Sequence, residues 1–174
     1  DPGKESIQYK DVLCMACEDN KCDFKATKLK RRVPTDYDVV IKMHYCGVCH
    51  SDIHTAAGHL DGIAGASEYP MVPGHELAGI VSEIGSKVTK FKVGMKIGVG
   101  CMVDSCGSCA SCAKGWEHKC KKQVGTYNSD DKSNRNLNVP VRSKTLGGYT
   151  DLFIVHENFG VSIPDSYPLE YAGP

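Results

Sequence analysis

Short apolar and β-branched runs, separated by 18 glycines and 8 prolines, dominate the pattern of hydrophobic and polar positions along the chain. Runs of this length between turn-forming residues favour strands over helices. Four of them predict strands, over residues 38–45, 79–85, 93–100 and 149–155. The pattern therefore predicts a mainly β domain, a barrel or sandwich rather than a helix bundle.

Helical patterns are scarce and short. Residues 51–58 predict one helix, with Ser51 as its N-cap and Gly58 at its end. Residues 167–172 resemble the opening turn of a second helix. The stretch 128–144 is rich in Ser, Asn and Asp, and it predicts a surface loop.

Length and charge narrow the class of protein. A chain of 174 residues with 41% hydrophobic residues can bury a core of its own. The chain has 21 Lys and Arg residues together and 21 Asp and Glu residues together, so its net charge is zero. It therefore lacks the excess of basic residues that is typical of proteins that bind nucleic acid or anionic lipid. No apolar run reaches the roughly 18 residues that a membrane span needs.

The 10 cysteines are the unusual feature of the composition. A disulfide scaffold is one explanation, but disulfide-dense domains are typically small and secreted. Here the cysteines fall in close Cys-x-x-Cys steps mixed with histidines, which suits a reduced, intracellular metal protein better. We therefore expect a cytoplasmic protein.

Four cysteines form the first candidate metal cluster, with spacings of three, three and eight residues. They are Cys106, Cys109, Cys112 and Cys120. Four thiolates fill the tetrahedral coordination of Zn²⁺ and leave no open position, so the cluster predicts a structural zinc site. A disulfide pair and an iron–sulfur cluster are the alternatives.

A second candidate cluster combines Cys49 with His75 and Glu76. Each motif is weak alone, because a Cys-x-x-Cys or a His-Glu pair is common in proteins without metal. Together they supply a thiolate, an imidazole and a carboxylate, which is the mixed ligand set of catalytic zinc. A catalytic site keeps one coordination position open for its substrate.

The motifs around these residues resemble those of the zinc-dependent medium-chain alcohol dehydrogenases, in particular the cinnamyl alcohol dehydrogenase-like branch. Gly74-His75-Glu76-x-x-Gly79-x₅-Gly85-x₂-Val88 is similar to the zinc signature of the superfamily. The segments 45–52, 69–76 and 98–100 and the four-cysteine spacing are similar to the branch's own motifs. The resemblance implies a GroES-like barrel with short helices over residues 1–174 and a zinc lobe at about 101–122.

The resemblance also implies roles for the second cluster. Cys49 and His75 would ligate the catalytic zinc, and Glu76 would lie beside the metal and ligate it transiently. Asp52 would orient the histidine ligand. Cys46, by contrast, would be a buried thiol at the end of a strand.

Three further roles follow from the resemblance. Ser51 would take the proton from a zinc-bound alcohol, His54 would carry it outward, and His50 would lie near the cofactor pyrophosphate. The implied reaction is reversible hydride transfer between NADP(H) and a small primary alcohol or aldehyde, aromatic or allylic in kind.

The family's third protein ligand, a cysteine, is expected just beyond Pro174, followed by the nucleotide-binding domain. No Gly-x-Gly-x-x-Gly turn occurs within these 174 residues. We therefore expect residues 1–174 to hold structural zinc, to bind catalytic zinc poorly and to be inactive alone, whereas the full-length enzyme would be a homodimer.

Two other classes of protein remain as alternatives: a zinc-ordered, non-catalytic binding module and a co-chaperonin-like ring. The constellation around Cys49, Ser51 and His75 favours the enzyme, since neither alternative needs it.

Overall fold

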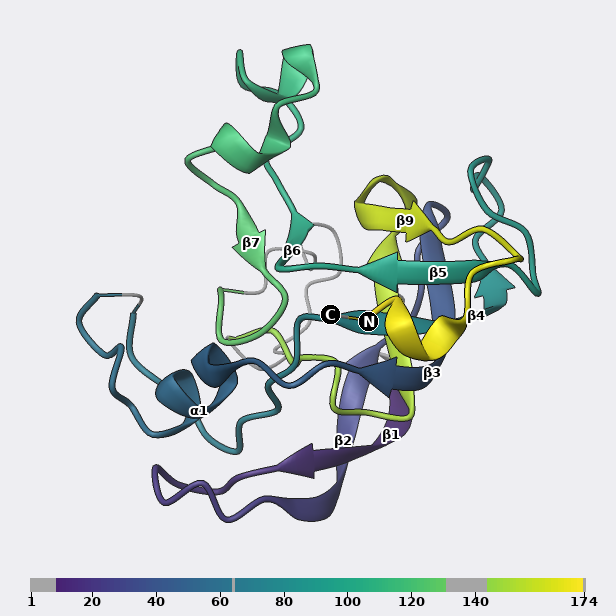
Figure 1. Ribbon diagram of the computed structural model, residues 1–174. Coiled ribbons are helices and arrows are strands. Elements are labelled where there is room, and N and C mark those ends of the chain that lie inside the picture. The colour runs from purple at the N-terminus through teal and green to yellow at the C-terminus, as the bar shows by residue number, and fades with distance from the viewer. Residues whose placement is uncertain (1–8, 64, 131–143, 174) are drawn as a thin grey trace, which may run out of the picture.

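The computed structural model describes residues 9–63, 65–130 and 144–173, and it shows three antiparallel sheets with one short α-helix (Figure 1). The strands are β1 (Tyr9–Ala16), β2 (Lys25–Arg32), β3 (Asp38–Cys46), β4 (Leu77–Ile84), β5 (Lys96–Val99), β6 (Met102–Asp104), β7 (Val124–Gly125), β8 (Leu152–His156) and β9 (Gly160–Ser162). The helix is α1 (His50–Ala56), and the 3-10 turns are η1 (Cys112–Lys114), η2 (Glu117–Lys119), η3 (Glu157–Phe159) and η4 (Leu169–Tyr171). Within the described ranges, none of the helices has the length and apolar character needed to cross a membrane.

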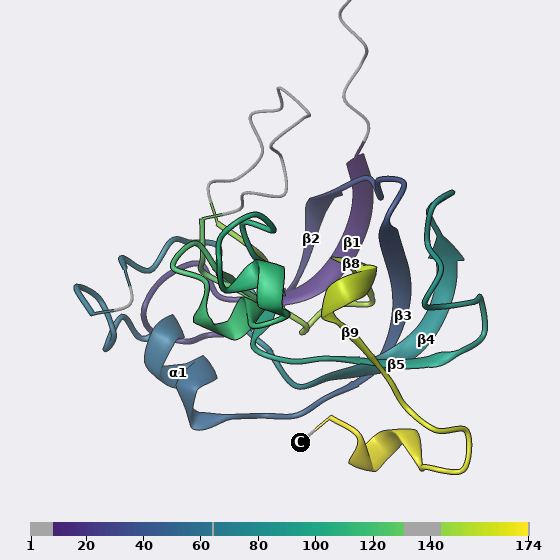
Figure 2. The ribbon, with the colours of Figure 1, turned by 90° about the horizontal axis from the view of Figure 1, so that it is seen from above.

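The largest sheet has five strands in the order β8-β3-β4-β5-β9, and Figure 2 shows it curling around the interior. Two register shifts interrupt the pairing of β3 with β4, at Val40/Ile41 and Met43/Tyr45. Such bulges increase the local twist and bend of a sheet. Apolar side chains of this sheet and Phe91, from the segment between β4 and β5, form the main core. The sheet residues of this core are Val39, Ile41, Leu77, Val81, Ile97, Val99, Phe153 and Val155.

Two smaller sheets extend this body. The hairpin β1–β2 buries Val12, Cys14 and Ala16 against Val72 and Leu146, which form a second core cluster. Strands β6 and β7 form a short ladder, from which the segment with η1 and η2 projects as a separate lobe (Figure 1).

The expected mainly β domain with short helices is confirmed, and the four predicted strands correspond to β3, β4, β5 and β8. Two of them are shorter than predicted. β5 begins only at Lys96, because Gly94 adopts a left-handed φ of +92° in a turn. β8 begins at Leu152, because Tyr149 and Asp151 make backbone hydrogen bonds with β1 instead.

The predicted helix is confirmed, but its predicted N-cap is wrong. Cys49 takes the extended cap conformation, and Ser51 lies inside α1. The reason is Asp52, whose carboxylate accepts a hydrogen bond from the Cys49 backbone N–H at 3.0 Å and fixes the earlier start. Gly58, with φ +73°, follows the helix end as expected.

The polar stretch 128–144 is described only at its two ends, and 131–143 lie outside the described residues. Asn128 differs from the expectation of an exposed loop, because it is buried and its side chain hydrogen-bonds Ala66 and Glu68. The helical turn expected at 167–172 is a single 3-10 turn, η4.

Candidate functional site

The mixed cluster predicted from the sequence is assembled by two chain segments. Cys49 caps α1, and His75 and Glu76 lie in the loop that enters β4. One ligand atom from each of the three side chains lies within 4.8 Å of the others. The structure thus brings together residues that are about 26 positions apart in the chain.

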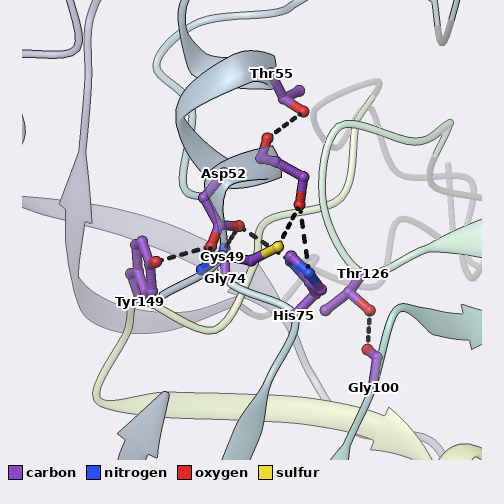
Figure 3. Close-up of polar contacts among 9 residues, drawn as sticks. Cys49, Asp52, Thr55, Gly74, His75, Gly100, Thr126 and Tyr149 are labelled. Carbon is purple, nitrogen blue, oxygen red and sulfur yellow. Dashed lines mark hydrogen bonds and ion pairs between the residues drawn. The ribbon is translucent and has the colours of Figure 1, made fainter. Parts of the chain in front are cut away.

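Asp52 lies behind this cluster and is 1% exposed. Its carboxylate accepts four hydrogen bonds (Figure 3). Oδ1 accepts from the Gly74 backbone N–H and from His75 Nδ1, both at 3.0 Å. Oδ2 accepts from the Cys49 backbone N–H at 3.0 Å and from the Tyr149 hydroxyl at 2.9 Å. An Nδ1–H···carboxylate bond leaves the Nε2 lone pair of His75 free to bind a metal.

Two tyrosines in the site were missed by the sequence analysis. Burial, followed by the hydrogen bond to Asp52, raises the pKa of Tyr149, so this hydroxyl stays protonated and acts as a donor. The ring of Tyr127 lies 5.6 Å from that of His75, and burial raises the pKa of Tyr127 to about 12. Neither tyrosine lies in a recognisable motif, so only the tertiary fold reveals them.

Two glycines make room for these contacts. Gly74 has a φ of +102°, and a Cβ there would come within 2.9 Å of Cys46 Sγ and 2.8 Å of the Tyr149 ring. A Cβ on Gly47 would collide with the Glu76 carboxylate. Glycine at 47 therefore leaves the space that this carboxylate occupies beside Cys49.

Ser51 borders the two predicted metal ligands. Its hydroxyl donates to Cys49 Sγ at 3.1 Å and lies 3.5 Å from His75 Nε2. A metal ion held by Cys49 and His75 would therefore lie close to this hydroxyl, and so would any further atom bound to that metal.

The two histidines of α1 lie further out. His50 is exposed, and its ring centroid is 4.3 Å from that of the half-buried His54. His54 Nδ1 lies 3.1 Å from His59 Nδ1. Within the described residues no direct hydrogen bond joins Ser51 to His54, so the structure does not by itself connect the two predicted relay positions.

The donor set at Cys49, His75 and Glu76 fits a zinc ion, because thiolate, neutral imidazole and carboxylate are the ligands that catalytic zinc takes. Cys46 ends β3 and is only half buried, although it was expected to be buried. Burial raises the pKa of Cys46 to about 11, and Cys46 is not among the residues whose ligand atoms converge with those of Cys49, His75 and Glu76.

The four-cysteine cluster also converges, at the base of the projecting lobe. The four sulfurs of Cys106, Cys109, Cys112 and Cys120 lie within 4.8 Å of one another. Cys112 Sγ is 3.5 Å from Cys109 Sγ and 3.9 Å from Cys106 Sγ. Sulfurs on one tetrahedral zinc at about 2.3 Å are about 3.8 Å apart, so the cluster has the dimensions of a closed zinc site.

Backbone N–H groups donate to several of these sulfurs. Hydrogen bonds from the backbone N–H groups of Ser108 and Cys109 lower the pKa of Cys106 to about 6. The Cys120 sulfur accepts from the backbone N–H of Cys106 at 3.5 Å and of Lys122 at 3.3 Å. Since zinc binds thiolates, Cys106 is already close to the charge state that the metal requires. Cys112 differs, because its hydrogen bond with Ser105 acts to lower its pKa but burial and the neighbouring Cys109 outweigh it and raise the pKa to about 11, so metal binding there would have to displace a proton. His118 is exposed and lies outside this cluster.

Comparison with known proteins agrees with this geometry. Cinnamyl alcohol dehydrogenase 8 of Arabidopsis thaliana is 42% identical over 97% of this chain and 44% of its own length. NADP-dependent alcohol dehydrogenase C 1 of Mycolicibacterium smegmatis is 45% identical over 85% of this chain and 40% of its own. The solved structure of the Helicobacter pylori cinnamyl alcohol dehydrogenase, complexed with NADP(H), superimposes with a TM-score of 0.85 and 36% identity over 95% of this chain and 45% of that one.

The chain thus spans less than half the length of these relatives. The family model described as the alcohol dehydrogenase GroES-like domain matches residues 35–165, which include both cysteine-containing clusters. This match, together with the curled sheet and the two clusters, shows that the chain belongs to the family of alcohol dehydrogenase GroES-like domains.

Proposed function

We propose that this domain forms the catalytic zinc site of an NADP(H)-dependent alcohol dehydrogenase. The enzyme would interconvert a small primary alcohol and its aldehyde, with aromatic or allylic compounds as the preferred class. The observation that carries the proposal is the convergence of Cys49, His75 and Glu76, with the buried Asp52 holding the far side of the imidazole. The names of the relatives support the reaction, the substrate class and NADP.

The site would hold zinc through Cys49 and His75, with Glu76 beside them. Bound zinc supplies Lewis-acid polarisation of an alcohol or carbonyl oxygen, and a bound nicotinamide supplies the hydride carrier. Asp52 fixes the tautomer and direction of the His75 ring through the Nδ1 hydrogen bond. The domain's own contribution is therefore to orient these ligands before substrate arrives.

Ser51 would handle the proton of the alcohol. Its hydroxyl lies 3.1 Å from the Cys49 sulfur, so a substrate oxygen beside that ligand is within its hydrogen-bonding reach. Because Ser51 has no direct hydrogen bond to His54, we propose that a further hydroxyl or water bridges them before the proton reaches solvent. His50, exposed beside His54, is proposed to contact the cofactor pyrophosphate.

The four-cysteine lobe, at about 101–122, would hold the structural zinc. We further propose that residues 1–174 form the N-terminal unit of a longer, homodimeric enzyme in the cytoplasm, with a nucleotide-binding domain after this unit. The relatives' greater length supports the additional domain. The cysteine-rich metal ligand sets support a compartment that keeps thiols reduced.

Kinetics of the full-length protein test the proposal. With cinnamyl alcohol and NADP⁺, Ser51→Ala should lower kcat by about 10²–10⁴-fold, the range for a lost general acid–base group. Ser51→Thr keeps a hydroxyl and should retain most of the rate, so it serves as the matched control. Cys49→Ser should remove one zinc per chain by elemental analysis. If Cys49→Ser loses its zinc but Ser51→Ala keeps the kcat of the parent enzyme, the proposed role of Ser51 is wrong. If the zinc-loaded protein does not oxidise the alcohol at all, the proposed function is wrong.

A further inference from the structure

Three histidines lie along one face of α1 and in the turn that follows it, outside both cysteine-containing clusters. His50 and His54 are four residues apart, so they lie on one face of the helix, with ring centroids 4.3 Å apart. The chain then turns back through Gly58, and His59 comes to lie beside His54. The surface of the domain thus carries three neighbouring imidazoles.

The turn holds His59 in this place. Its backbone N–H donates to the His54 carbonyl at 2.9 Å, and Gly58 takes a left-handed φ of +73° that other residues rarely adopt. The backbones of His54 and His59 therefore lie next to each other, and their side chains face each other. Their Nδ1 atoms are 3.1 Å apart, and the ring centroids are 5.4 Å apart.

The separation of these nitrogens suits a shared metal ion. Imidazole nitrogens bind zinc at about 2.0–2.1 Å, so two of them on one ion lie about 2.9 Å apart at a right angle and about 3.4 Å apart at a tetrahedral angle. The observed 3.1 Å falls between these values. A hydrogen bond joins the same atoms in the absence of metal, and modest ring rotations convert one arrangement into the other.

The surroundings indicate the class of ion. Asp61, close to Gly58 in the same turn, already accepts hydrogen bonds from the Ser67 backbone N–H at 2.8 Å and from its hydroxyl at 2.7 Å. Both bonds go to Oδ1 of Asp61, and the ligand atoms that face each other at this site are imidazole nitrogens, which suit nickel, copper and zinc rather than magnesium or calcium. His59 is exposed and His54 half exposed, so water can complete the coordination.

We propose that His54 and His59 form a surface binding site for a divalent transition-metal ion of the nickel, copper and zinc class. Among the described residues, sets of three or more candidate ligands converge within 4.8 Å only at the two cysteine-containing clusters, so two protein ligands are assigned to this site. His50 becomes a third ligand if its exposed side chain turns toward His54. This site rests on the imidazoles of His54 and His59 and not on the proposed function.

Ni²⁺ titration of the zinc-loaded chain, followed by calorimetry, tests the site. His59→Asn removes one ligand at an exposed position and should weaken nickel binding by at least about tenfold. His44→Asn is the matched control, because His44 is an exposed histidine on β3, and it should leave the affinity unchanged. Cys49→Ser should also leave it unchanged, since the nickel would not occupy the catalytic cluster.

Two results would overturn the proposal. One is nickel affinity in His59→Asn within twofold of the parent chain, and the other is loss of nickel binding in Cys49→Ser with His59→Asn unaffected. Paramagnetic broadening of amide signals offers a second readout, and it should be centred on residues 54–60 in the parent chain. A folded His59→Asn chain that shows the same broadening would equally contradict the site.

A consequence for activity follows only where the proposed function also holds. An ion on His54 Nδ1 would occupy the proposed relay residue, so micromolar nickel should inhibit the full-length enzyme, and His59→Asn should relieve the inhibition. Nickel binding without inhibition would leave the metal site standing and would count against the relay role of His54.

Discussion

The Asp52 carboxylate offers the sharpest test of how the candidate site is built. It is buried and accepts four hydrogen bonds, from the backbone N–H groups of Cys49 and Gly74, from His75 Nδ1 and from the Tyr149 hydroxyl. Asp52→Asn changes almost no volume but replaces one acceptor oxygen by an NH₂ group. The substitution therefore isolates the hydrogen bonding from the packing.

Either orientation of the new amide leaves one backbone donor unsatisfied. With NH₂ at the Oδ2 position, the Tyr149 hydroxyl can rotate to accept from it, but the Cys49 N–H cannot. With NH₂ at Oδ1, His75 can change its tautomer, but the Gly74 N–H cannot. A buried orphan donor costs about 1–3 kcal/mol, and the remaining bonds lose their charge assistance, so we expect a total loss of about 2–4 kcal/mol.

Urea unfolding, monitored by circular dichroism at fixed zinc, measures this loss as a lower midpoint at unchanged slope. Asp23→Asn is the control, because Asp23 is exposed and forms an ion pair with the exposed Lys25, so its effect should stay within about 0.5 kcal/mol. Competition with a chromophoric chelator should show about tenfold to hundredfold weaker zinc binding at the Cys49 cluster in Asp52→Asn. An Asp52→Asn chain as stable as Asp23→Asn, with unchanged zinc affinity, would refute this account of the site.

Three further predictions test other parts of the domain. Cys109→Ser should lower the zinc content by one ion per chain and make the projecting lobe the first site of proteolysis, and unchanged zinc would contradict the closed four-thiolate site. Gly74→Ala places a Cβ within 2.9 Å of Tyr149 at a φ of +102°, so unfolding experiments should show a loss of more than about 1 kcal/mol. For Asp38, burial acts to raise the pKa, but the hydrogen bond and charge of Arg32 outweigh it and hold the pKa below its ordinary value. The ionised Asp38 carboxylate therefore stabilises the fold fully above its unfolded pKa of about 3.9, and this stabilisation is lost as pH falls toward its lower pKa in the folded state. The difference in unfolding free energy between wild type and Asp38→Asn should be constant above about pH 5 and should shrink below about pH 4.

The fold could be predicted where a strand has a clear apolar pattern. Residues 38–45 are β-branched, and β3 forms there with Val39, Val40 and Ile41 fully buried. The hairpin β1–β2 was not predicted from the pattern. In β1 nearly every position from Val12 to Ala16 is apolar, so the sequence does not show which face is buried. In β2 five of the eight residues are lysine or arginine, a composition that is typical of an exposed edge strand and not of a strand that joins a core.

The candidate ligands were predictable because metal coordination restricts both residue type and spacing. Zinc requires thiolate, imidazole or carboxylate, so Cys49 and His75 are recognisable from the sequence alone. The supporting hydrogen bonds are not restricted in this way. Tyr149 reaches Asp52 across 97 positions of sequence, and any donor that the fold placed there would satisfy the same oxygen. Such a contact carries no local signal, which is why the structure was needed to find it.

The hydrogen bonds of Asp52 also predict how folding and metal binding are linked. Asp52 joins the start of α1 to the loop of Gly74 and His75 and to the segment of Tyr149, and that last segment is itself held by backbone hydrogen bonds to β1. The carboxylate has all its partners only when these four parts of the chain have come together. The orientation of His75 is therefore a product of the completed fold, and zinc bound there stabilises the whole domain rather than a local loop. In the four-cysteine lobe all the candidate ligands come from residues 106–120, so zinc bound there would order a short segment whose opening would not disturb the main core.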